Sequence, residues 1–261
     1  NIRIEAAGKT SVASDDDVER FVAGAAGEST SQAPGIPAMV MADGPAGVRI
    51  NPAVGIPTTA WPCATLLACT WDPELACQEG RAGALEAKEM GLAIWLTPAL
   101  NIHRSPLCGR NFEYFSEDPY VSGKMAAAMI KGTQSQRIVA TPKHLACNNK
   151  ETNRKESDSI LSERALREIY LRGFEIVVRS AQPMALMSSY NLVNNIKVSE
   201  TPALITDLPR DEWGWTGMFM TDWGGGIDAV AQMHAGNDLI MPGFKHTMMA
   251  TLSDEIRLNC A

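Results

Sequence analysis

The chain has 261 residues, of which 45% are hydrophobic and 20% are charged, a composition typical of a globular protein and not of a disordered one. Its formal net charge is −7 and it has no long basic stripe, which argues against nucleic acid as a partner. It also has no apolar run of about 18 residues, so we expect no membrane span.

The six cysteines include no CxxC pair, which disfavours a zinc site. In a chain this apolar we expect buried thiols, not a disulfide framework, and therefore a reducing, cytoplasmic location. The chain starts at Asn1 without the apolar core of a signal peptide. That start resembles a cut or a domain edge, so secretion of a precursor stays open.

The first 34 residues are polar and rich in Ser, Gly and Ala, which predicts a linker segment. Within it, residues 14–25 read as one short helix, because three Asp residues in the first turn suit the positive end of the helix dipole.

From residue 38 onward, six stretches share one form, in which a short apolar run stops at a cluster of polar or charged residues. They are 38–49 (AMVMADGPAGVR), 94–104 (IWLTPALNIHR), 138–144 (IVATPKH), 184–191 (MALMSSYN), 218–226 (MFMTDWGGG) and 237–243 (NDLIMPG). Buried parallel strands read as continuous apolar runs, so we expect six such strands. Residues 64–69 are a candidate seventh.

Helical stretches separate these runs. Asp72 and Asp118 each precede a proline and should cap helices that run to about Met90 and Gly132, while Ser162 opens a third helix over 162–180. A shorter helix is expected over 224–235. Strands alternating with helices predict an α/β fold with parallel strands and right-handed crossovers.

About 30 residues per unit favour a (β/α)8-type TIM barrel, complete or incomplete, over residues 35–261. An open doubly wound sheet is the alternative. It is disfavoured because no GxGxxG motif follows the first strand.

Parallel strands in a barrel bring their C-terminal ends to one mouth, where the chemistry sits. The residues expected there are Asp43, Arg49, Lys143, His144, Tyr190 and Asp222. Each has an ordinary structural explanation when taken alone: a turn, a surface charge, a buried histidine, a rim aromatic or a helix cap. A lysine at the end of an apolar strand nevertheless needs a partner.

The residues around these strand ends suit a carbohydrate. Asp222 can act as a nucleophile or base, Trp223 offers a flat face to a sugar ring, and the glycines after them allow a close approach. Arg110 is a fork donor to hydroxyls or a carboxylate, Glu113 is an expected orienting group, and Arg154 lies in a polar loop, where surface exposure is the ordinary reading. Carboxylates, cationic donors and an aromatic in one pocket would grip hydroxyls and meet an oxocarbenium-like carbon.

The remaining aromatic and imidazole side chains receive structural assignments. We expect packing roles for Trp61, Trp71, Trp95, Trp213 and Trp215. His103, His234 and His246 lack metal-ligand spacing, so no metal site is expected.

The motifs MADGPAGVR, LTPALNIHRSPLCGRNFEYFSEDP, ATPKHLACNN with ETNR, LMSSYN and MTDWG together resemble glycoside hydrolase family three, in its β-glucosidase branch, from about residue 35 to 243. The resemblance implies a barrel that hydrolyses terminal non-reducing β-D-glucosyl residues with retention, without a metal or organic cofactor. It makes Asp222 the nucleophile. It assigns sugar binding to Asp43, Arg49, Arg110, Lys143, His144, Arg154 and Tyr190.

The chain departs from the family pattern in its second carboxyl group, since retaining hydrolysis also needs an acid/base. Two-domain relatives carry that Glu in an α/β-sandwich domain, for which this chain has no room. Hexosaminidase relatives use a His in a KHFPGHG loop, where this sequence reads KHLACNNKETNR. We expect the barrel part of a larger protein, with the acid/base supplied by another domain or chain.

Three readings of function stay open at this point. The leading one is a β-glucosidase acting on β-glucosides or cello-oligosaccharides, and a β-xylosidase or mixed exo-glycosidase is a close rival. The third is a sugar-binding barrel without turnover. The sequence leaves the oligomeric state open, a homo-oligomer included.

Overall fold

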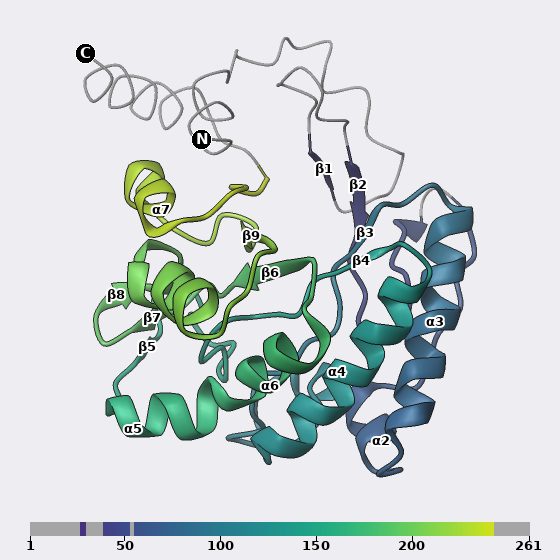
Figure 1. The fold of residues 1–261 in the computed structure, drawn as a ribbon, viewed down its shortest axis with the longest axis horizontal. Helices are drawn as coiled ribbons and strands as arrows, with labels where there is room; N and C mark the ends of the chain where they lie inside the picture. The colour runs from purple at the N-terminus through teal and green to yellow at the C-terminus, as the bar shows by residue number, and fades with distance from the viewer. Residues whose placement is uncertain (1–26, 30–38, 53–54, 243–261) are drawn as a thin grey trace, which may run out of the picture.

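The computed structural model describes residues 27–29, 39–52 and 55–242 (Figure 1). The helix expected over 14–25, and the residues Gly243, His246 and Cys260, lie outside these ranges. The boundary expected between residues 34 and 35 also lies outside them.

The helices and strands alternate along the chain as expected for an α/β protein. In order they are β1 Gly27–Ser29, β2 Met39–Ala42, α2 Ala64–Ala68, α3 Pro73–Glu89, β3 Ile94–Trp95, the 3-10 helix η3 Asn111–Glu113, α4 Pro119–Ser135, β4 Val139–Ala140, β5 Asp158–Ser159, α5 Glu163–Ala165, the π-helix η4 Leu166–Tyr170, α6 Arg172–Ala181, β6 Ala185–Ser188, β7 Leu192–Val193, β8 Ile196–Lys197, the 3-10 helix η5 Val198–Glu200, the π-helix η6 Ala203–Glu212, β9 Met218–Thr221 and α7 Ala229–Ala235.

The six expected strand runs lie side by side in chain order, and every pairing between them is parallel. β2 pairs with β3, β3 with β4, and β6 with β9. Single parallel bridges continue the series from Leu145 to Ser188 and from Met220 to Leu239. The polar residues that follow these strands therefore meet at one edge, as the sequence predicts.

The series of parallel strands remains open within the described residues. It appears as small separate sheets joined by single bridges, and no pairing closes it into a barrel there. β1 adds an antiparallel strand to the edge of β2, and β5, β7 and β8 form a small sheet of their own. The prediction of an α/β fold with parallel strands is confirmed, whereas a complete TIM barrel is not seen.

The candidate seventh strand is wrong. Its residues, ATLLA, form helix α2, in which Leu67 and Ala68 are buried and Leu66 is exposed. Ala and Leu are strong helix formers, and a six-residue apolar run does not distinguish a strand from one turn of buried helix. The Thr65 hydroxyl donates to the carbonyls of Asn111 and Tyr114, which fixes α2 against the loop that carries η3.

The predicted helix starts are correct at three positions, although the single helix expected over 162–180 is divided into the short α5, the π-helix η4 and α6. The carboxylates of Asp72 and Asp118 accept from free N–H groups of α3 and α4, and Ser162 accepts from the Ala165 N–H of α5. The last helix begins later than expected, at Ala229, because Asp228 is its cap. Its three preceding glycines belong to the loop after β9.

The helices form a layer outside the strands, with α4 packed between α3 and α6 (Figure 1). The α3–α4 contact is close because it is made by glycines. A Cβ atom on Gly132 would lie 2.0 Å from the Cys77 carbonyl oxygen, and one on Gly80 would lie 2.2 Å from that of Met129.

Trp95 connects this helix layer to the strand ends. Its ring packs where Gly83 of α3 has no side chain, and its indole N–H donates to the Gly44 carbonyl over 3.0 Å. Gly44 follows the β2 aspartate, so a buried core residue holds the first loop of the mouth in place.

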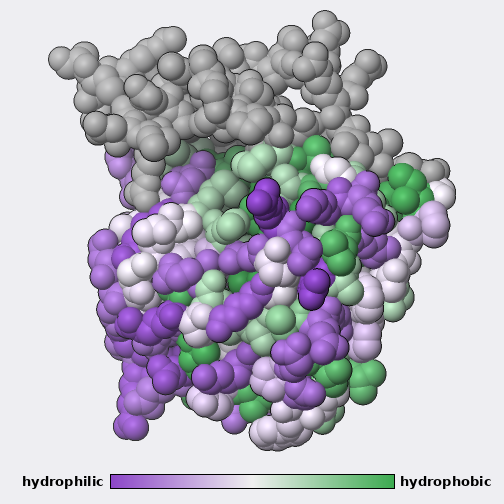
Figure 2. Space-filling model, turned by 45° about the vertical axis from the view of Figure 1, so that its right-hand side comes forward, coloured by the Kyte–Doolittle hydropathy of each residue, from purple (hydrophilic) through white to green (hydrophobic). Residues whose placement is uncertain are grey.

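Most of the remaining packing assignments agree with the structure. Trp213 and Trp215 are buried, and all five cysteines in the described part of the chain are free thiols. The expectation that the thiols are buried holds for Cys108 and Cys147 and is wrong for Cys69, which is exposed after α2. Trp71 contradicts its assignment, because it is 77% exposed at the junction of α2 and α3. Polar and apolar residues are interspersed over the face in Figure 2, and no helix in the described ranges is long and apolar enough to cross a bilayer.

Gly132→Ala should lower the free energy of unfolding by about 1–3 kcal/mol, because the added methyl group forces α3 and α4 apart. This cost exceeds the gain of up to about 1 kcal/mol from the higher helix propensity of alanine. Urea unfolding of both proteins measures the difference. Gly109→Ala is the control, since a Cβ atom there meets nothing within 4 Å. An unchanged or raised midpoint for Gly132→Ala would contradict this packing.

Candidate active site

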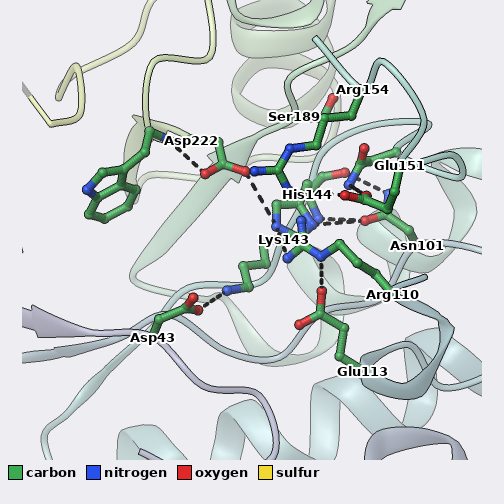
Figure 3. Close-up of polar contacts among 12 residues, drawn as sticks. Asp43, Asn101, Arg110, Glu113, Lys143, His144, Glu151, Arg154, Ser189 and Asp222 are labelled. Carbon is green, nitrogen blue, oxygen red and sulfur yellow. Dashed lines mark hydrogen bonds and ion pairs between the residues drawn. The ribbon is translucent and has the colours of Figure 1, made fainter. Parts of the chain in front are cut away.

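One cavity of about 700 Å³ opens at the C-terminal ends of the parallel strands. All nine side chains predicted for the site line it: Asp43, Arg49, Arg110, Lys143, His144, Arg154, Tyr190, Asp222 and Trp223. They come from the loops after β2, β3, β4, β6 and β9. Residues far apart in the sequence, such as Asp43 and Asp222, therefore lie in one place (Figure 3).

Asp43 and Lys143 form the centre of the floor. The Lys143 ammonium donates to Asp43 Oδ1, and the lysine side chain is only 3% exposed. Arg49 Nη2 lies 3.0 Å from the other oxygen of Asp43, although this arginine is largely exposed. Burial alone would raise the pKa of Asp43, but the charge and hydrogen bond of Lys143, together with the Gly44 backbone N–H and the charge of Arg49, lower it to about 2.

Lys143 and His144 both line the cavity although they are adjacent in sequence. Neighbours on a regular strand point to opposite faces. Here the regular strand β4 ends at Ala140, and Lys143 makes only an isolated bridge to Ala99. The strand has therefore ended before the pair, so strand alternation does not apply to these two residues and both side chains can face one pocket.

Arg110 links two walls of the cavity. Its Nε donates to the buried carboxylate of Glu113, three residues later, and its Nη2 lies 2.9 Å from His144 Nε2. Glu113 thus orients the guanidinium, as expected from the sequence. Burial, reinforced by the charges of Arg110, Lys143 and Arg154, holds the pKa of His144 well below its ordinary value, so the ring is neutral.

Asp222 follows β9 and is almost fully buried. Its Oδ1 accepts from the Trp223 backbone N–H over 2.7 Å, and the Tyr190 hydroxyl hydrogen-bonds to the carboxylate. Burial raises the pKa of Asp222, against the opposing effects of Lys143, these two hydrogen bonds and Arg110. Asp222 caps no helix, since α7 takes Asp228 as its cap.

Arg154 and Tyr190 close a further side. The Arg154 guanidinium stacks 4.4 Å from the centre of the Tyr190 ring, and its Nη1 donates to Glu151 Oε2 over 3.1 Å. Arg154 is therefore held by two contacts, although its side chain remains 39% exposed, as its polar loop suggests.

Three residues of the site escaped the sequence reasoning. Glu151 pairs with Arg154, Asn101 bonds the backbone and ring of His144, and Phe112 lines the cavity while half of its ring surface is exposed. Glu151 and Phe112 stand inside the motifs ETNR and GRNFE, which were the available signals. Asn101 stands in LTPALN, where nothing local marks it.

The set has the chemistry to hold a polyhydroxylated ligand beside one carboxylate. Each described cationic side chain of the cavity bonds a fixed carboxylate or ring, so the donors are oriented before a ligand arrives. Asp222 lies among these donors (Figure 3), and Trp223, the next residue, also lines the cavity.

Comparison with known families shows which family the chain belongs to. The family model described as "Glycosyl hydrolase family 3 N terminal domain" matches residues 4–251, and the chain belongs to that family. Beta-glucosidase A of Butyrivibrio fibrisolvens is 57% identical over 207 residues, which cover 79% of this chain and 25% of that protein.

A solved structure and a second relative extend the comparison. Beta-glucosidase 3B of Thermotoga neapolitana, in complex with alpha-D-glucose, aligns at a TM-score of 0.87 and 47% identity over 92% of this chain and 35% of that one. An exo-alpha-(1->6)-L-arabinopyranosidase of Bifidobacterium longum is 43% identical over 217 residues, 80% of this chain and 29% of that protein. The chain thus spans about a quarter to a third of the length of these relatives.

Lys143→Met should raise the pKa of Asp43 from about 2 toward its ordinary value of 3.8. A carboxyl whose pKa is lowered by folding stabilises the folded state fully above the unfolded pKa, and that contribution is lost as pH falls through the folded pKa. Between about pH 4 and 2 the wild-type protein should therefore lose stability more steeply than the variant. Carboxyl NMR titration and urea midpoints measure both, and identical curves would contradict the pairing.

Proposed function

We propose that the chain is the catalytic N-terminal domain of a retaining β-glucosidase that removes terminal non-reducing β-D-glucosyl residues from β-glucosides or cello-oligosaccharides. The observation that carries the proposal is the position of Asp222. It is a buried carboxylate at a strand end, surrounded by oriented hydrogen-bond donors in a cavity of sugar-binding character. The family membership and the beta-glucosidase relatives support the same substrate class.

In this proposal Asp222 is the nucleophile. Its carboxylate attacks the anomeric carbon as the bond from that carbon to the leaving oxygen breaks, and an acid/base group protonates that oxygen. Water then attacks the glycosyl-enzyme, the same group takes the proton, and Asp222 leaves with its electron pair. The sugar is released with its β-configuration.

The other residues bind the sugar in the same proposal. Arg49, Arg110, Lys143 and Arg154 donate to sugar oxygens, Tyr190 orients Asp222, and the indole of Trp223 covers a face of the ring. Asp43 and His144 are the hydrogen-bond acceptors on the floor. The ion pairs described above support this division, because they fix each donor before binding.

We propose further that the acid/base comes from a domain or chain beyond the described residues. Besides Asp222, the carboxylates that line the described cavity are Asp43 and Glu113. Asp43, with a pKa of about 2 beside Lys143, has no proton to give near neutral pH. Glu113 is bonded to Arg110. The share of the relatives' length that this chain covers supports the presence of further protein.

A pentopyranosidase or mixed exo-glycosidase is the second candidate. The Bifidobacterium relative named as an arabinopyranosidase favours it, since a pentopyranose lacks the C6 hydroxymethyl group. Relative rates on paired aryl β-D-glucosides, β-D-xylosides and α-L-arabinopyranosides distinguish the two. A sugar-binding barrel without turnover would bind glucose and hydrolyse none of them.

Asp222→Gly in the complete enzyme should lower hydrolysis of an aryl β-glucoside with a good leaving group by about a thousandfold or more, because the nucleophile is gone. Azide should restore release of the phenol and give α-glucosyl azide, since one displacement inverts the anomeric carbon. Asp228→Asn, which touches only the α7 cap, is the control and should keep near wild-type rates. A β-glucosyl azide, or an active Asp222→Gly enzyme, would sink the assignment.

A further inference from the structure

Asn101 lies buried behind the cavity and contacts His144 at three points. Its Nδ2 donates to the His144 carbonyl over 2.8 Å, and its Oδ1 accepts from the His144 backbone N–H over 2.9 Å. The same Oδ1 lies 3.2 Å from His144 Nδ1. Figure 3 shows Asn101 reaching the ring from the side away from Asp222.

The two backbone contacts determine which way the Asn101 amide faces. A flipped amide would set its NH2 group against the His144 N–H and its oxygen against the His144 carbonyl, and both hydrogen bonds would be lost. Oδ1 is therefore the atom opposite Nδ1. An amide oxygen only accepts, so Nδ1 has to carry the ring proton.

The opposite edge of the ring requires the same tautomer. Arg110 Nη2 lies 2.9 Å from Nε2, and a guanidinium only donates, so Nε2 is the acceptor. Asp222 Oδ2 is 3.6 Å from Nε2, too far to draw a proton onto it by a hydrogen bond. Lys143, Arg154 and the ring of Tyr114 also lie near the imidazole. Burial, together with the charges of Arg110, Lys143 and Arg154, lowers the pKa of His144 and keeps the ring neutral near pH 7.

We propose that Asn101 is a positioning residue that fixes His144 as its Nδ1–H tautomer, so that Nε2 faces the cavity as a hydrogen-bond acceptor. The two hydrogen bonds to the His144 backbone hold this residue at the strand end. The contact with Nδ1 determines which ring nitrogen carries the proton.

A consequence for the ligand follows, and it rests on the proposed sugar-binding function. Nε2 has one lone pair, which Arg110 Nη2 occupies in this structure, so a sugar hydroxyl that donates its proton to Nε2 takes the place of that guanidinium N–H. Arg110 can then donate to the oxygen of that hydroxyl or of its neighbour. At this one position fluorine cannot replace the hydroxyl, because fluorine accepts and does not donate.

The tautomer is measured directly by two-bond 1H–15N correlation on protein labelled with 15N-histidine. The chain has four histidines, and His144→Gln identifies the signals of His144 by their loss. We expect Nδ1 in the protonated range and Nε2 in the unprotonated range at neutral pH. A protonated Nε2 in the wild-type protein would overturn the proposal, whether or not the protein hydrolyses a glycoside.

Variants test the part played by Asn101. In Asn101→Leu the Nδ1–H loses its acceptor while Arg110 still faces Nε2. We therefore expect a second signal from the Nε2–H tautomer beside the original one, whereas a single unchanged tautomer would show that Arg110 alone sets it and would overturn the proposal. Asn101→Asp keeps an acceptor opposite Nδ1, so Nδ1 should stay protonated there; loss of that proton would contradict the proposal, and this variant serves if the leucine variant does not fold. Asn149→Leu is the matched control, because Asn149 bonds the Ile102 carbonyl of the same loop.

The ligand consequence is tested with glucose and its monodeoxy and monodeoxyfluoro analogues at each hydroxyl. At one position both analogues should bind about tenfold more weakly than glucose, the loss expected for one hydrogen bond, and Asn101→Leu should erase that difference. If fluorine restores binding at every position, the acceptor role of Nε2 is wrong. If no sugar binds, the proposed function fails while the tautomer measurement stands.

Discussion

A lysine ammonium removed from water has to be bonded to a carboxylate, and the Lys143–Asp43 pair is the contact on which the site depends. An unpaired charge at this depth would cost several kcal/mol, so the two side chains have to meet. Asp43 follows the first of the six runs and Lys143 follows the third. The pair can form only if the ends of those strands lie at one edge. The formation of the floor of the cavity therefore depends on the parallel arrangement of the strands.

The other polar contacts extend the same arrangement around the mouth. Glu113 holds Arg110, Glu151 holds Arg154, and the Trp223 N–H and Tyr190 hydroxyl hold Asp222. These contacts fix the donors in space before a ligand binds, so binding does not have to order long side chains. The tightly packed glycines of α3 and α4, together with Trp95, keep the loops behind them in position.

Much of the site could be predicted because strong physical constraints act locally. An apolar run that ends in Asp, Lys or Tyr places that residue at a strand end, and the parallel topology then places the ends together. Asp72, Asp118 and Ser162 predicted three helix starts, because each can accept a hydrogen bond from the free N–H groups of the first turn. Contacts between distant residues were harder. Nothing near Asn101 marks its bond to His144, and the segment 64–68 is too short for its periodicity to separate helix from strand.

The series of parallel strands is open within the described residues. Parallel pairing connects consecutive runs, yet β1 occupies the outer edge of β2, and within the described residues no pairing joins the last run to the first. The cavity does not depend on closure, because all nine predicted side chains line it within the open series.

The central claim is that Asp222 is a nucleophile in a glucose-binding pocket. Intact mass after incubation with an activated 2-deoxy-2-fluoro-β-glucoside, followed by peptide mapping, tests it most directly, because the good leaving group removes most of the need for an acid. The account predicts a single fluoroglucosyl adduct on Asp222. A folded protein that stays unlabelled, or an adduct on any other residue, would contradict it.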